Sequence, residues 1–410
     1  MRTLVFVAPL FREGSNRFLQ AFASLPDLRL GVLSMEPASA IPPELKARIH
    51  SHFQVRDVAD TGELIRGVRG LQTAMGSVER LLTHLEELQI PVSDARERLG
   101  LEGMHGEVAR NFRDKDRMKA VLRAHGVPVA KSRLITSTHD AHRFATEVGY
   151  PIIVKPRAGL GARSTFRVKN LAELDALLAK NPATVGDPYQ AEEFVEGWES
   201  TCETVTIDGQ HVWRSGTHYL PGPLEVLENP WMQYCVLLPR DTNEKHFRDF
   251  DPINGAALDA LGMKTGLSHM EWFRRKDGSV LVNEVGGRPP GANIMPLMSH
   301  AYQTDMWRKW AELMAFGRFD PPDRALATGT AFFRGKSPTP GHGKVVAVHG
   351  LAEAQAEVGA YVVERKLPTV GQPRSKSYEG EGWAVVAHPD TRVVMQALKR
   401  LVELVRIEYG

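Results

Sequence analysis

Cysteine is nearly absent from this sequence, since its 410 residues include only Cys202 and Cys235. Two cysteines are too few for a disulfide framework or a cysteine-rich zinc site. Long apolar runs are missing as well. The run at residues 5–10 ends just before Arg12-Glu13, so it is too short for a signal peptide or a membrane span. We therefore expect a reduced, cytoplasmic protein without a membrane partner.

Several functional signatures are also missing. The sequence contains neither the phosphate-binding pattern GxxxxGK[ST] nor the dinucleotide pattern GxGxxG. A net charge of +2 gives no reason to expect nucleic acid as a partner. We find no internal repeat, no low-complexity segment and no Ser/His/Asp constellation. The function must therefore be sought in less familiar combinations of residues.

The length allows two or three domains, each with its own core. Strands expected at residues 3–8 and 28–34, with a helix at 16–24 between them, predict an N-terminal parallel α/β layer. A further helix is expected at residues 78–88, followed by a strand that begins at Ile90. A section rich in glycine and charge near residue 100 and a proline-rich section near residue 320 are expected to separate the domains.

Glu271 and Glu284 lie on two expected strands, residues 266–272 and 279–285. The pair Asp277-Gly278 between such strands predicts a tight hairpin. A two-residue turn centred there makes the numbers of opposed residues add up to 555, so Glu271 would face Glu284. Opposed carboxylates are destabilising unless they share a proton or a hard divalent cation. The sequence thus favours a metal site over the alternative, a solvated edge hairpin.

Other groups suited to phosphate accompany these carboxylates. The apolar stretch 151–155 ends in Lys155 and is followed by a glycine-rich loop at residues 157–164. A buried lysine needs a partner, and such a loop leaves amide hydrogens free to surround an anion, although many such loops are plain turns. Arg288, four residues after Glu284, lies in a glycine- and proline-rich turn that allows close approach to a ligand. These features together indicate phosphate chemistry.

An acidic stretch, residues 192–199, reads as a strand end that runs into a turn. It is either a solvated edge or a hinge whose backbone binds an adenine and whose last glutamate, Glu199, accepts from ribose hydroxyls. The order of all these parts resembles the ATP-grasp superfamily, and within it the carboxylate–amine ligases that act on L-amino acids. The resemblance covers residues 110–291.

The resemblance implies a mixed fold of the α/β and α+β classes with three parts. These are an N-terminal parallel α/β domain (residues 1–107), a central ATP-grasp domain (108–320) and a small C-terminal α+β domain (321–410). The central domain would include a lid subdomain at about residues 130–195.

The resemblance also assigns roles position by position. It makes Lys115 and Lys155 the nucleotide-binding lysines, Glu271 and Glu284 the metal ligands, and Arg288 a catalytic cation together with Lys155. The adenine clamp would be Glu192, Glu193, Phe194 and Val195, and the ribose-binding glutamate would be Glu199. The loop that closes over the triphosphate would include Gly159, Gly161, Arg163 and Ser164.

One position departs from the pattern. The family usually carries Glu-x-Asn, whereas this chain has Gly286 after Glu284. A second Mg²⁺ would then be held by Glu284 and phosphate oxygens alone, or Asn283 would substitute. In a regular strand Asn283 points to the face opposite Glu284, so we do not expect it to be a ligand. His269 shares a face with Glu271 and would contact phosphate or substrate, or serve as a structural histidine.

The activity implied is that of an ATP-dependent ligase, which forms a dipeptide-like amide bond through an acyl phosphate and releases ADP and phosphate. Its cofactors would be ATP and one or two Mg²⁺ ions, with Mn²⁺ as a substitute. Its partners would be small molecules, a carboxylic acid or amino acid and an amine or amino acid, and a homodimer is left open. The alternatives are a biotin carboxylase-like or purine-pathway enzyme that activates bicarbonate or formate, and a nucleotide-binding protein without turnover.

Overall fold

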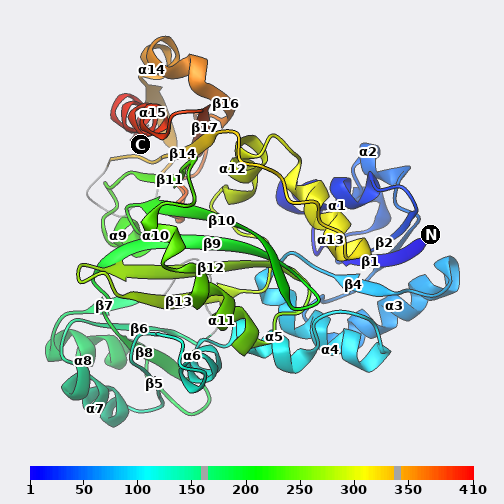
Figure 1. The fold of residues 1–410 in the computed structure, drawn as a ribbon, viewed down its shortest axis with the longest axis horizontal. Helices are drawn as coiled ribbons and strands as arrows, with labels where there is room; N and C mark the ends of the chain where they lie inside the picture. Colours follow the sequence, from blue (N-terminus) through cyan, green and yellow to red (C-terminus); the bar gives the residue numbers. More distant parts are fainter. Residues whose placement is uncertain (158–164, 337–342) are drawn as a thin grey trace.

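The computed structural model describes residues 1–157, 165–336 and 343–410. Figure 1 shows a large central sheet, an N-terminal layer beside it and a smaller α/β unit that packs near one edge of the central sheet. The fold belongs to the mixed class that the sequence predicts, with parallel strands at the N-terminus and antiparallel strands elsewhere. Every helix within the described ranges is too short or too polar to cross a bilayer.

The N-terminal layer is a parallel sheet with the strand order β3-β2-β1-β4. In β1, Leu4 and Phe6 belong to one hydrophobic cluster, whereas Val5 and Val7 belong to another. Apolar residues thus face both sides of the sheet, as they must when helices cover both faces. The elements are β1 (Arg2–Val7), α1 (Glu13–Ala23), β2 (Leu28–Ser34), η1 (Ala38–Ala40), α2 (Pro43–Lys46), β3 (Ser51–Gln54), α3 (Thr61–Met75), β4 (Arg80–Leu82), η2 (Glu86–Leu88) and α4 (Gln89–Leu99).

Two expectations about this layer are wrong. Residues 78–88 form the strand β4 and the 3-10 turn η2 instead of a helix, and the strand expected at Ile90 is the helix α4. Leu81 and Leu82 are both buried, and a short apolar run of this kind does not distinguish a buried strand from a helix. Pro91 lies in the first turn of α4, where its missing N–H loses no helical hydrogen bond.

Two helices, α5 (Gly106–Arg113) and α6 (Lys115–Ala124), lead into the smaller α/β unit, which we call the lid. The lid is an antiparallel sheet with the order β5-β8-β6-β7, and two helices pack on it. In Figure 1 it lies beneath β12 and β13 of the central sheet. Its elements are β5 (Ser132–Ile135), α7 (Thr138–Val148), β6 (Ile152–Pro156), β7 (Phe166–Val168), α8 (Leu171–Lys180) and β8 (Tyr189–Glu193).

The central sheet has eight antiparallel strands in the order β13-β12-β9-β10-β11-β14-β17-β16. Its last three strands come from the part of the chain after residue 320, so the sheet runs without a break across the expected start of a C-terminal domain. Its strands are β9 (Gly197–Ile207), β10 (Gln210–Leu220), β11 (Tyr234–Leu238), β12 (Gly266–Arg275), β13 (Val280–Gly286), β14 (Ala327–Phe333), β16 (Val362–Lys366) and β17 (Gly382–His388).

Helices and a short two-stranded sheet cover this central sheet. Among them, α13 reaches the N-terminal layer, where Trp310 packs edge-on against Phe18 with ring centroids 5.0 Å apart. The remaining elements are α9 (Pro223–Glu228), α10 (Lys245–Arg248), α11 (Asp251–Leu261), α12 (Ile294–Ala301), α13 (Met306–Phe316), β15 (Val345–His349), α14 (Leu351–Val358), η3 (Gly359–Tyr361), α15 (Thr391–Leu404) and β18 (Arg406–Tyr409).

The hairpin of β12 and β13 differs in detail from its predicted form. Its turn is a three-residue loop, because Arg275 and Ser279 form the last hydrogen-bonded pair and Gly278 adopts a φ of 87°. The paired numbers next to the turn, such as Phe273 with Leu281, therefore add up to 554. A bulge then takes one more residue out of β13, and Glu271 pairs with Glu284 after all.

Candidate active site

A cavity of about 770 Å³ lies between the lid, the central sheet and the N-terminal layer. All of the predicted site residues that the structure describes line it: Lys115, Lys155, Glu192, Glu193, Phe194, Val195, Glu199, His269, Glu271, Glu284 and Arg288. The predicted loop residues Gly159, Gly161, Arg163 and Ser164 lie outside the described residues. Side chains separated by up to 173 positions thus converge on one cavity, and its volume is ample for a nucleotide-sized ligand.

Glu271 and Glu284 are cross-strand neighbours on the wall of this cavity. The bulge lies at Asn283, which no longer follows the strict alternation of a strand and lines the cavity next to Glu284. The expectation that Asn283 points away from the site is therefore wrong, because it assumed a regular strand. The bulge supplies the site with two carboxylates and one amide from adjacent positions.

Lys115 holds one of these carboxylates. Its Nζ donates to Oε1 of Glu284 over 2.6 Å, from the first turn of α6. Asp114 caps that helix by accepting from two backbone N–H groups and also pairs with Arg157 at the end of β6. Burial raises the pKa of Glu284, but the charges of Lys115 and Lys155 outweigh it and hold the pKa below its ordinary value. Glu284 is thus kept ionised.

Lys155 belongs to a buried ion cluster between the lid and α6. Its Nζ lies 3.0 Å from Oε2 of Glu192, and the Nζ of Lys119 lies 2.8 Å from the same oxygen. All three side chains are at most 9 % exposed. Burial lowers the pKa of Lys119 to about 8, an effect that the charge of Glu192 only partly offsets. The Glu192 carboxylate thus positions two lysines, one of which, Lys155, lines the cavity.

The rest of the acidic stretch forms the far wall of the cavity. Glu193 accepts from the backbone N–H of Lys131 and from Arg275, over 3.0 and 3.1 Å. The guanidinium of Arg167 lies 4.3 Å from the ring centroid of Phe194. Burial, followed by the nearby charge of Glu271, raises the pKa of Glu199 well above its ordinary value. A planar base would fit against the aromatic side chain of Phe194, and hydroxyl groups would fit against the carboxyl group of Glu199.

His269 connects Glu271 to the interior of the sheet. Its Nδ1 lies 2.8 Å from Oε1 of the fully buried Glu203, and its Nε2 lies 3.7 Å from Oε1 of Glu271. Burial lowers the pKa of His269, but the hydrogen bonds with the two glutamates reverse this and raise it to about 9. Tyr219 donates from its hydroxyl to the same oxygen of Glu271. Glu271 is thus oriented from two sides.

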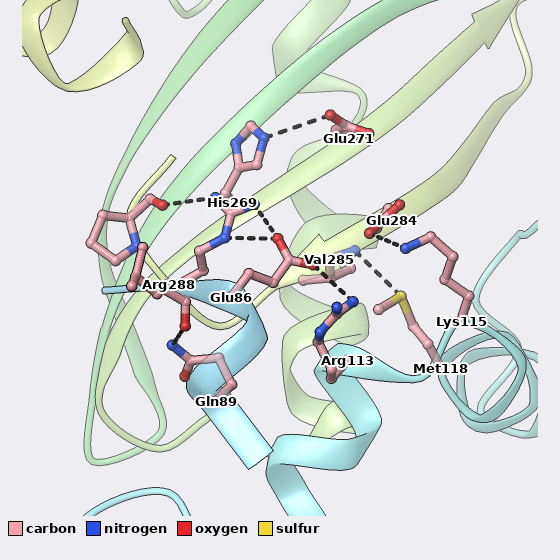
Figure 2. Close-up of polar contacts among 12 residues, drawn as sticks. Glu86, Gln89, Arg113, Lys115, Met118, His269, Glu271, Glu284, Val285 and Arg288 are labelled. Carbon is pink, nitrogen blue, oxygen red and sulfur yellow. Dashed lines mark hydrogen bonds and ion pairs between the residues drawn. The ribbon is translucent and has the colours of Figure 1, made fainter. Parts of the chain in front are cut away.

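Arg288 meets a carboxylate from the N-terminal layer. Figure 2 shows Glu86 between Arg288 and Arg113, with Lys115 and Glu284 on the other side of the site. Nε of Arg288 donates to Oε2 of Glu86 over 2.9 Å, and Nη1 of Arg113 donates to Oε1 over 3.3 Å. Burial lowers the pKa of Arg288, and Glu86 raises it again, so that the net shift is upward. The N-terminal layer is therefore part of the site.

Sequence reasoning missed Glu86, Lys119 and Glu203. Lys119 had a usable signal, because it lies one helical turn after Lys115 and so on the same face of the expected helix. Glu86 had none, since it lies in a short 3-10 turn within a segment expected to be a regular helix. Glu203 becomes recognisable only when the strand pairing brings it next to His269.

The donor set fits a magnesium ion that is shared with a ligand. Mg²⁺ is commonly bound by one or two carboxylates together with phosphate oxygens, and Glu271 and Glu284 supply two. In the ranges 1–157, 165–336 and 343–410, no three or more His, Cys, Asp or Glu side chains are grouped as a complete metal cage. The remaining coordination positions would therefore come from a nucleotide.

Sequence comparisons relate this chain to a known domain family and to curated ligases. Residues 120–297 match the family model described as the ATP-grasp domain. The L-arginine-specific L-amino acid ligase of Bacillus subtilis is 24 % identical over 57 % of this chain and 57 % of its own length. Alanine–anticapsin ligase of Bacillus subtilis is 23 % identical over 60 % of this chain and 55 % of its own. The chain thus spans just over half the length of these curated relatives.

Two solved structures resemble the entire chain. The L-amino acid ligase from Bacillus licheniformis has a TM-score of 0.76 at 18 % identity and covers 100 % of this chain and 99 % of its own. N5-carboxyaminoimidazole ribonucleotide synthetase from Thermotoga maritima has a TM-score of 0.70 at 19 % identity and covers 100 % of both chains. At these identities the likeness establishes the fold alone.

Proposed function

Because residues 120–297 match the ATP-grasp domain, we propose that this chain is an ATP-dependent ligase that joins a carboxylic acid or amino acid to an amine or amino acid. The observation that carries the proposal is the convergence of five charged groups on one cavity: Glu271, Glu284, Lys115, Lys155 and Arg288. Carboxylates for a metal and cations for phosphate are the parts that phosphoryl transfer needs.

In the proposed reaction, an oxygen of the substrate carboxylate attacks the γ-phosphorus of ATP, and the bond from that phosphorus to the bridging oxygen breaks. ADP leaves, and the amine then displaces phosphate from the acyl phosphate to form the amide. Lys115, Lys155 and Arg288 offset the negative charge that develops on the phosphoryl oxygens, and Glu271 and Glu284 would hold the metal. A bound Mg²⁺ would act as a Lewis acid on the phosphate oxygens.

The predicted roles of the remaining residues follow the same scheme. Glu193, Phe194 and Val195 would hold the adenine, and Glu199 the ribose. Glu192 would act by positioning Lys155. For a second metal ion, we propose that Asn283 takes the position of the asparagine that Gly286 replaces. His269 would orient Glu271 and not transfer a proton itself, since two glutamates hold it in its charged form.

The amino-acid ligase reading is preferred because curated relatives of that kind match the chain over more than half its length. A second reaction, activation of bicarbonate or formate, is kept as the alternative, because a biotin carboxylase domain solved with MgADP and bicarbonate shares this fold. A nucleotide-binding protein without turnover is the third possibility, which the missing asparagine suggests. All three share the nucleotide site and differ in the acceptor.

A screen of amino-acid pairs with MgATP tests the proposal. We expect ADP and phosphate to appear only with particular pairs, and the Glu284→Gln variant to lose at least a hundredfold in that rate while its melting temperature stays within a few degrees. Release of phosphate with bicarbonate or formate alone would favour the second reaction. AMP and pyrophosphate as products would contradict the acyl-phosphate route, and wild-type turnover in Glu284→Gln would exclude that residue from the metal site.

A further inference from the structure

A second cavity, of about 370 Å³, lies behind the active site. It is enclosed by β4 and α4 of the N-terminal layer, by the start of α5, and by the ends of the central sheet at Asp208 and at residues 262–267. Gly287 forms part of its wall, whereas Gly286 and Arg288 on either side of it line the active-site cavity. The backbone at residues 286–288 therefore borders both cavities.

Arg96 is the unusual residue of this second cavity. Its side chain is nearly fully buried, since the residue is 4 % exposed, yet no carboxylate of the described residues lies within ion-pair distance of it. Nε donates to the carbonyl of Leu81, and Nη1 donates to Ser93 Oγ and to the carbonyl of Met104. All three acceptors are neutral, and Nη2 donates to none of the described residues.

An unpaired buried cation is uncommon, because burying a charge without a counter-charge is costly. The C-terminal end of α4 offers Arg96 only a fraction of a negative charge. Arg80 adds a second guanidinium to the same wall and pairs with Glu102 over 2.7 Å. The buried Nε of Arg80 has no hydrogen-bond partner in the described ranges. Burial and the charge of Arg80 lower the pKa of Arg96 to about 10.

Much of the remaining wall surface is apolar and adaptable, although the charged residues Glu102, Asp208 and Lys264 also line the cavity. Met104, Met263 and Met314 line it together with Leu267 and Trp310. Methionine side chains fit ligands of irregular shape because they are unbranched and flexible. A small inorganic anion would satisfy Arg96 but would leave this apolar surface without a partner.

We propose that this second cavity binds a small organic carboxylate, with its carboxyl group on Arg96 and its hydrocarbon part against the methionines. The carboxylate of the ligand would supply the missing counter-charge and would accept a charge-assisted hydrogen bond from Nη2 of Arg96. The volume lies at the small end of the range of ligand sites, which limits the ligand to a compact molecule. The site does not depend on the proposed ligase reaction, since it holds no residue of the nucleotide cavity.

Straight-chain monocarboxylates serve as probes because they lack the amino group that an amino-acid substrate would carry. Acetate, butyrate, hexanoate and inorganic phosphate would be titrated calorimetrically into the full-length protein without ATP, at constant ionic strength. We expect hexanoate to bind at one site and more tightly than acetate. Equal affinity for phosphate and hexanoate, or no binding of any carboxylate, would overturn the proposal.

Two valine variants locate the binding. Val108 lines the second cavity and is half-buried on α5, so Val108→Phe should fill the space and weaken hexanoate binding at least tenfold. Val121 is half-buried in the same hydrophobic cluster but lines neither cavity, and Val121→Phe is the matched control. Unchanged affinity in Val108→Phe would place the ligand elsewhere and overturn the proposal.

Arg96→Gln tests the counter-charge directly, and its affinity for hexanoate should also fall at least tenfold. Because Arg96 also ties Leu81 to Met104, this variant carries a risk of misfolding. If Arg96→Gln does not fold, the comparison of Val108→Phe with Val121→Phe decides whether hexanoate binds in the second cavity. A folded Arg96→Gln protein that binds hexanoate as the wild type does would contradict the role of the guanidinium.

Discussion

Glu192 lies between Lys119 and Lys155, inside a lid whose hydrophobic core is small. Three charges in one buried place are expensive to desolvate, and they are tolerated because each lysine offsets the carboxylate. The arrangement fixes the head group of Lys155 at the edge of the active-site cavity. At the scale of single residues, the site is thus organised by counter-charges, since Glu192 lines the cavity and also holds the head group of Lys155 in place.

Replacing Lys119 tests this organisation. Lys119→Met should lower the free energy of unfolding by about 3 kcal/mol, because it removes one partner from a buried ion pair. The affinity for ATP should also fall, since Glu192 and Lys155 lose their fixed positions. Chemical denaturation and nucleotide titration measure the two effects. Lys180→Met, at an exposed lysine of the lid, is the control and should change neither.

His84 makes stability depend on pH. It stacks on Phe18 with centroids 4.4 Å apart, and burial together with the charge of Arg288 lowers its pKa to about 3. The unfolded chain therefore binds a proton below about pH 6.5 that the folded chain refuses down to pH 3, so stability falls as the pH falls through this window.

Comparison with His84→Leu isolates this contribution. Between pH 7 and pH 5, we expect the unfolding free energy of the wild type to drop by about 1–2 kcal/mol more than that of the variant. Denaturant unfolding at several pH values measures the difference. Parallel pH profiles for the two proteins would show that His84 is not the responsible group.

At the scale of elements, the hairpin of β12 and β13 contains one turn residue more than a two-residue turn and one bulged residue at Asn283. Each shifts the register by one position, and the two shifts cancel at Glu271 and Glu284. Gly278 makes the three-residue loop feasible because its φ of 87° lies in the left-handed region, which glycine adopts without strain.

Replacing Gly278 with alanine tests whether the turn requires a glycine. Gly278→Ala is expected to lower the free energy of unfolding by about 1–2 kcal/mol, since an added side chain disfavours the left-handed conformation. Gly14→Ala is the matched control, because Gly14 lies inside α1 with open space around it and should gain up to about 1 kcal/mol. Thermal or denaturant unfolding would reveal the opposite signs. Equal effects of the two replacements would contradict the role given to the turn.

This hairpin also illustrates how far the sequence alone could lead. The pairing of Glu271 with Glu284 was predicted and is confirmed, although the prediction assumed a regular ladder and a two-residue turn. The bulge left no trace in the pattern of residue types, because Asn283 is as acceptable in a regular strand end as in a bulge. The consequence for Asn283 was therefore predicted incorrectly.

Segments with strong local signals were predicted well. The strand expected at residues 28–34 agrees with the structure. The segment at residues 78–92 failed because its apolar residues are buried on both sides of a strand and because Pro91 is harmless in a first helical turn. Glu86, which depends on this segment, could be found only from the packing of the N-terminal layer on the central sheet.

At the scale of the whole molecule, three units contribute to one cavity. The lid supplies Lys155, the central sheet supplies Glu271 and Glu284, and the N-terminal layer supplies Glu86. Figure 2 shows that Glu86 and Arg288 meet although 202 positions separate them. Correct docking of the layers is therefore a condition for an intact site.

Removal of the Glu86 charge tests this condition. We expect Glu86→Gln to lower kcat/KM for the acid substrate by ten- to a hundredfold, because Arg288 and Arg113 lose the counter-charge that orients them. The dissociation constant for ATP should change little, since Glu86 does not contact the lysines of the lid. Steady-state kinetics and nucleotide titration would measure both, with Glu87→Gln, at the exposed neighbouring glutamate of the same 3-10 turn, as the control.

The three-residue turn and the bulge at Asn283 compensate each other, so the pairing of Glu271 with Glu284 does not depend on the register at the tip of the hairpin. If the segment between the turn and Asn283 slipped by one residue, both irregularities would vanish together and the two glutamates would still be partners. What holds the observed register is then the burial of Val282, which such a slip would move out of the core. A slip of the tip at its present length would accordingly leave the two carboxylates opposite each other.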